Sequence, residues 1–155
     1  MNGYDSYDAP YSAGNTEMKR QLGEAIAAGR QALASLRQAE KSLGSAKGWG
    51  IFDMLGGGML ASLIKRGHME DAAEAMRGAR DDLAVFQREL LDVQLRRDFD
   101  LETEGFLSFA DLFFDGFAAD FLIQRKIDKA NRQLKEAIGQ VSSILNALEE
   151  KYRTL

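Results

Sequence analysis

Three long segments of the chain repeat apolar or small residues at alternating spacings of three and four. This spacing places the repeated side chains on one side of an α-helix, where they must pack against another helix to leave water. The sequence therefore predicts helices over about Thr16–Ser45, His68–Arg97 and Arg125–Tyr152. The three heptad stripes are Met18, Leu22, Ala25, Gly29, Ala32, Leu36, Ala39 and Leu43; Met69, Ala72, Met76, Ala79, Leu83, Phe86, Leu90 and Val93; and Ile127, Ala130, Leu134, Ala137, Val141, Ile144 and Leu148.

The rest of the chain favours an all-α fold. Hydrophobic residues make up 45% of the sequence, enough for a core, and the alternation typical of strands does not occur after residue 14. Residues 1–14 hold few aliphatic side chains and surround the single proline, which predicts a flexible N-terminal tail. We therefore expect residues 15–155 to form one helical bundle, with Gly44 and Gly48 ending its first long helix.

Two short, very apolar segments separate the long helices. In the first, Trp49 lies between two glycines, so we expect non-helical backbone there, and Asp53 can cap a short helix over about Met54–Arg66. Gly56, Gly57 and Gly58 favour close helix packing. The second segment, residues 106–122, adds two carboxylates four residues apart, Asp111 and Asp115. Its bulky or small packing residues are Phe106, Phe109, Phe113, Gly116 and Phe117.

The second half of the chain echoes the first at an offset of 58 residues. Asp53 aligns with Asp111, Gly58 with Gly116, and the stripe of residues 69–86 with that of residues 127–144. Matched units of this size predict an internal duplication of a helix hairpin, with repeat units of about residues 48–98 and 106–153. The predicted architecture is three long coiled-coil-like helices, crossing at about +20°, plus two short apolar helices. Chance recurrence of Ala and Leu is the alternative explanation.

Catalytic and cofactor motifs are scarce. The chain has no Cys and one His, His68, which leaves little from which to build a zinc or iron site. The glycines at 56–58 fit neither phosphate-binding fingerprint, and no nucleophile–base pair stands out. The sequence therefore predicts a non-enzymatic protein without a cofactor. A carboxylate site for Mg²⁺ or another ligand, built from Asp53, Asp111 and Asp115, remains an alternative hypothesis.

The predicted function is a helical interaction or scaffold protein acting through its heptad stripes. We expect a homo-oligomer, such as a dimer, or a helical protein partner, because the short apolar segments cannot cover helices of this length. A net charge of −4 argues against nucleic acid. The sequence shows neither a signal peptide nor an apolar run of about 18 residues, which predicts a cytoplasmic protein. Peripheral membrane association through the Phe-rich residues 106–122 is the other alternative hypothesis.

Overall fold

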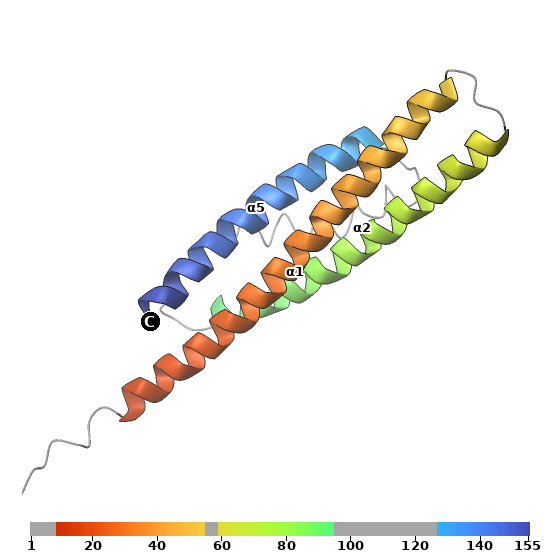
Figure 1. Ribbon diagram of the computed structural model, residues 1–155. Helices are drawn as coiled ribbons and strands as arrows, with labels where there is room; N and C mark the ends of the chain where they lie inside the picture. The colour runs from red at the N-terminus through yellow and green to blue at the C-terminus, as the bar shows by residue number, and fades with distance from the viewer. Residues whose placement is uncertain (1–8, 55–58, 95–126) are drawn as a thin grey trace, which may run out of the picture.

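The computed structural model describes residues 9–54, 59–94 and 127–155, and within these ranges the chain is helical (Figure 1). The helices are α1 (Ala9–Met54), α2 (Met59–Gln94) and α5 (Ile127–Thr154). Helix α1 packs against both others, and α2 and α5 each run antiparallel to it (Figure 1). The all-α prediction is confirmed for the described residues.

The predicted heptad stripes form the core. Side-chain burial is described for residues 13–44, 70–93 and 128–155, and every stripe residue in these ranges except Met18 is buried; Met18 is partly buried and packs against the core. Burial of each large aliphatic side chain contributes about 1.5–3 kcal/mol. The largest fully buried side chains are Phe86, Leu22, Leu36, Leu43, Met76, Leu83, Leu90, Leu134, Leu148 and Val93.

One side of the α1 stripe faces α2. Ser35 donates a hydrogen bond to the carboxylate of Asp82, and the Gln31 side-chain amide donates to the same carboxylate oxygen at 3.3 Å. Both contacts lie beside the buried stripe. We call Gln21, Ala28, Ser35 and Ser42, which repeat at heptad spacing, the α2-facing flank of α1. This flank is small and polar, so it supplies partners for a carboxylate.

The opposite side of the stripe faces α5. The Lys19 ammonium lies 5.6 Å from the centroid of the Tyr152 ring, and Arg30 donates to Glu149 at 2.8 Å. We call Lys19, Ile26, Leu33 and Glu40 the α5-facing flank of α1. A heptad step from the Lys19–Tyr152 contact brings Ile26 opposite Leu145, and a further step brings Leu33 opposite Ile138. This flank is therefore apolar in its middle.

The three helices converge at Gly29, which is buried in the middle of the α1 stripe. A Cβ atom at this position would lie 2.6 Å from Cδ2 of Leu145 on α5 and 2.8 Å from Cε2 of Phe86 on α2. Real Cβ contacts are longer than this, so the two side chains occupy the space that any other residue would need. Glycine at 29 therefore lets both neighbours contact the α1 backbone at one level.

Helix α1 is longer than the sequence predicted. It begins at Ala9, so residues 9–14 are helical and not part of a flexible tail, and it continues to Met54 past Gly44 and Gly48. A glycine costs a helix only about 1 kcal/mol relative to alanine and keeps its backbone hydrogen bonds. A cost of this size is too small to end a long helix by itself. Residues 1–8 lie outside the described part of the chain.

Two of the five predicted helices are merged. The expected short helix 54–66 and the helix from His68 are one element, because α2 runs from Met59 to Gln94 through Gly67. Asp53, expected to cap a helix start, and Trp49, expected in non-helical backbone, both lie in the last turns of α1. The five-helix arrangement is therefore not found in the described ranges. The second apolar segment, residues 106–122, lies outside them.

We predict that Gly29→Ala destabilises the bundle. The added methyl group would overlap Phe86 and Leu145, and overpacking of this kind costs about 1–3 kcal/mol, which exceeds the gain in helix propensity of about 1 kcal/mol. Thermal or denaturant unfolding followed by circular dichroism measures the change.

Gly78→Ala is the matched control, because Gly78 is also inside a long helix but a Cβ there would meet nothing within 4 Å. We expect this variant to be as stable as the parent or more stable, by up to about 1 kcal/mol. Equal effects of the two substitutions would contradict the close approach at Gly29.

Candidate interaction groove

A groove runs along the surface between α1 and α5. It is lined by residues from the exposed sides of both helices, which are Gly23, Ile26, Ala27, Arg30, Glu149, Tyr152 and Arg153. Each lies on or next to the α5-facing flank of α1 or the corresponding flank of α5. The groove therefore follows directly from how the two helices pair.

An apolar residue, Ile26, lies at the base of the groove, and the neighbouring α1 residues Gly23 and Ala27 have small side chains. Ile26 belongs to the core, whereas Leu33 and Ile138, one heptad further along, are only partly buried against it. Gly23 is half-buried, and the Tyr152 ring lies 4.0 Å from where its Cβ would be; Ala27 and Ala34 are exposed. Small side chains let a partner approach a helix backbone closely.

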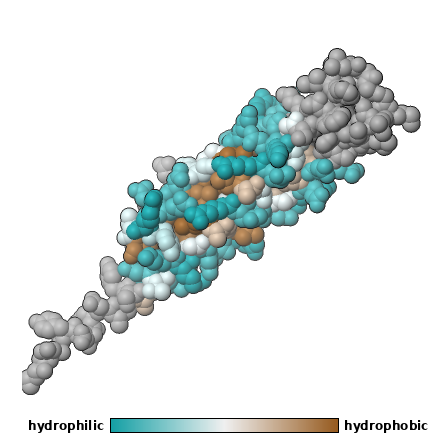
Figure 2. Space-filling view, in the orientation of Figure 1, coloured by the Kyte–Doolittle hydropathy of each residue, from teal (hydrophilic) through white to brown (hydrophobic). Residues whose placement is uncertain are grey.

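The space-filling view shows this apolar surface. In Figure 2, brown residues gather in a strip along the middle of the visible face, over the region where α1 and α5 lie side by side in Figure 1, and teal hydrophilic residues border it. The strip is open to the viewer. A partly exposed apolar strip with a polar rim is typical of a protein-binding surface.

The rim carries more positive than negative charge. Arg30 and Glu149 form an ion pair across the groove at 2.8 Å, with 66% and 35% of their side chains exposed. A pair this exposed contributes at most about 1 kcal/mol, because solvent screens it. Arg153 and Lys19 add two further cations at the same end, and the Lys19 ammonium lies over the Tyr152 ring. Glu149 is the carboxylate among these lining residues.

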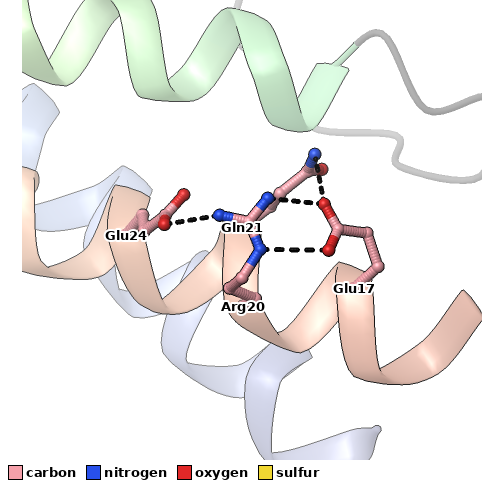
Figure 3. Close-up of polar contacts among 4 residues, drawn as sticks. All are labelled: Glu17, Arg20, Gln21 and Glu24. Atoms are coloured by element: carbon pink, nitrogen blue, oxygen red, sulfur yellow. Dashed lines mark hydrogen bonds and ion pairs between the residues drawn. The ribbon is translucent and has the colours of Figure 1, made fainter. Parts of the chain in front are cut away.

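Arg20, one turn before Gly23, is engaged differently (Figure 3). Its guanidinium donates to both oxygens of Glu17, at 2.6 and 3.0 Å, and to Glu24 at 2.6 Å. The hydrogen bond to Glu17 is the main cause that raises the pKa of Arg20, and the charges of Glu17 and Glu24 raise it further. Arg20 is thus neutralised within its own helix, whereas Arg30 shares a single oxygen of Glu149.

Most of the sequence-predicted site residues lie outside the described part of the chain. Trp49 and Asp53 lie on α1, while Gly56, Gly57 and Gly58 and the residues of 106–122 are outside the described ranges, so their proposed roles stay predictions. Among described residues, no group of three or more His, Cys, Asp or Glu side chains is placed to hold a metal ion. His68 lies inside α2.

The groove residues were not predicted as a site from the sequence, although part of the signal was present. Ile26, Leu33, Ile138 and Leu145 widen the heptad stripes on one side, which indicates a second neighbour. The helix that each edge of a stripe faces depends on how α1 pairs with α5. The spacing of apolar residues along the sequence does not reveal that pairing. Gly23 and Ala27, on the adjoining side of α1, look like ordinary helix-surface residues until that pairing is known.

Within the described ranges, no helix is both long enough and apolar enough to cross a membrane. No protein-family model matches the sequence, and comparisons with curated proteins and with solved structures also find no match.

Proposed function

We propose that this chain is a non-enzymatic helical interaction protein that binds another helix. The observation that carries the proposal is the groove between α1 and α5, which has Ile26 in its lining and the partly buried Leu33 and Ile138 one heptad further along the same two helices. Helix-in-groove recognition uses such a groove to bury the apolar residues of a partner helix at spacings of three and four. The partner is a second copy of the chain or a different helical protein.

The position of the groove supports this proposal. Its α1 lining runs from Gly23 to Arg30, about 10 Å at 1.5 Å per residue, which matches about two turns of a partner helix. Ile26 lines the groove, and the partly buried Leu33 lies seven residues further along α1, the same period that a partner stripe has.

We also propose that α2 and α5 descend from one duplicated helix. The support is that the 58-residue offset relates buried positions in both: Ala72, Met76, Ala79, Leu83 and Phe86 on α2 correspond to Ala130, Leu134, Ala137, Val141 and Ile144 on α5. Both helices also run antiparallel to α1 and pack on opposite flanks of its stripe. In this proposal the duplication supplied two copies of one α1-binding helix.

The proposed function predicts that blocking the groove abolishes helix binding. A neutral, fluorescently labelled amphipathic peptide of about 18 residues, with Leu at heptad spacing and Gln elsewhere, should bind the full chain with saturation in fluorescence anisotropy. Ala27→Trp places an indole in the groove and should weaken this binding at least tenfold, because the peptide can no longer reach the floor.

Val85→Trp is the matched control, since Val85 is an exposed position (38%) on the outside of α2, away from the groove. It should leave peptide binding unchanged. Light scattering of the same samples reports whether the chain rises above its monomer mass of 17.2 kDa as concentration increases. A chain that stays monomeric and binds no amphipathic peptide of any charge would contradict the proposed function.

A further inference from the structure

The groove has a charge preference, and this goes one step beyond the proposed function on which it rests. We infer that the groove between α1 and α5 selects an acidic amphipathic helix: a helix with an apolar stripe for the floor and Asp or Glu side chains on both sides of that stripe. The inference depends on the charged side chains that line the groove and on their repetition at heptad spacing along α1 and α5.

The α1 wall repeats small and basic residues. Ala27 and Arg30 line the groove directly, and a step of one heptad brings Ala34 and Arg37 to the same side of the helix. Ala27, Arg30, Ala34 and Arg37 are all exposed. Exposed alanines let a partner helix lie close, and the arginines beside them then reach past its backbone to carboxylates on its flank.

The α5 wall is basic at both ends and neutral in its middle. Arg153 and Glu149 line the groove, and heptad steps back from Glu149 bring Ser142 and then Lys135 to the same side of α5. Lys135 and Arg153 are exposed. Glu149, the carboxylate in the groove lining, is already paired with Arg30, whereas Glu136 and Glu150 are exposed and are not lining residues. The α5-facing flank of α1 also carries one half-buried carboxylate, Glu40, but Arg37, Lys135 and Arg153 outnumber it. An incoming acidic helix therefore meets less repulsion than a basic one.

The outside of α2 shows that this charge is specific to the groove. Apart from Asp82, which accepts hydrogen bonds from α1, the described part of α2 from Glu70 to Val93 carries six carboxylates, Glu70, Asp71, Glu74, Asp81, Glu89 and Asp92, against three arginines, Arg77, Arg80 and Arg88. An acidic helix is thus repelled from the α2 side and attracted to the α1–α5 side. Complementary charge steers approach and excludes wrong partners more than it adds affinity.

A pair of peptides tests the charge preference. Both keep the leucine stripe of the neutral probe; one carries Glu and the other Lys at the positions flanking the stripe. At low salt the Glu peptide should bind the full chain at least tenfold more tightly than the Lys peptide, which corresponds to about 1.4 kcal/mol. Because salt screens exposed charges, the ratio should fall towards one at about 1 M ionic strength.

Charge-reversal substitutions on the protein show which residues cause the preference for the Glu peptide. Arg37→Glu combined with Lys135→Glu should remove or invert the preference for the Glu peptide, while Arg88→Glu, a reversal at an exposed arginine on α2, should leave the preference for the Glu peptide in place. Circular dichroism confirms that each variant keeps its helix content. These exposed positions lie outside the core, so the variants are expected to fold.

The outcomes separate this inference from the proposed function. If Glu, Lys and neutral peptides all bind equally and Ala27→Trp weakens each, the groove binds helices and the charge preference is wrong. If no peptide binds, both proposals fall. Light scattering that shows a dimer dissociated by Arg37→Glu would assign the groove to a second copy instead. Flotation with anionic vesicles, abolished by the same change, would assign it to a lipid surface; either result overturns the inference.

Discussion

The architecture depends on a close approach of three helices at one glycine. Gly29 lies in the middle of the α1 stripe, and the volume that its side chain would fill is taken by Phe86 from α2 and Leu145 from α5. The apolar stripe of one helix is narrow. Two neighbouring helices can pack against the same stripe only if its side chains are small where both make contact. Ala25 and Ala32, the adjacent stripe residues, are also small and fully buried, so the narrow part of α1 extends over about two turns. The larger Leu22 and Leu36 follow on either side.

The two flanks of α1 then decide which neighbour packs where. Ser35 and Gln31 offer donors, and Asp82 on α2 accepts from both, so this carboxylate is satisfied where α2 meets α1. The flank with the apolar Ile26 and Leu33 in its middle faces α5 instead. If α5 moved to the α2 side, the register that pairs Asp82 with Ser35 would be lost. Because a polar group left without partners at a helix interface costs about 1–3 kcal/mol, this contact also disfavours a register shift.

The sequence contains the stripes but not their pairing. Periodicity identified every buried stripe position in the described ranges, from Leu22 to Leu148, because a 3–4 spacing has one structural interpretation when sustained over several turns. The helix ends were predicted poorly: Gly44 and Gly48 were expected to end the first helix and a new helix was expected at His68, yet α1 and α2 run through these positions. A glycine weakens a helix by about 1 kcal/mol, which is too little by itself to end a long helix. The Arg30–Glu149 pair joins residues 119 positions apart, and only the fold reveals it.

The groove follows from the narrowness of the α1 stripe, which two helices share at Gly29. Helix α1 gives one flank to α2 and the other to α5, and among the described helices no third one covers the outer edge of either pair. On the α2 side that edge is polar, with Gln31 and Asp82 hydrogen-bonded across it. On the α5 side the edge is the apolar pair Leu33 and Ile138, which are only partly buried. The Lys19 ammonium over the Tyr152 ring and the Arg30–Glu149 pair border one end of it, and an exposed ion pair opens at little cost in free energy. A groove built in this way can be occupied without rearranging the core, because the close approach of Phe86 and Leu145 to Gly29 already fixes how the helices beside it pack.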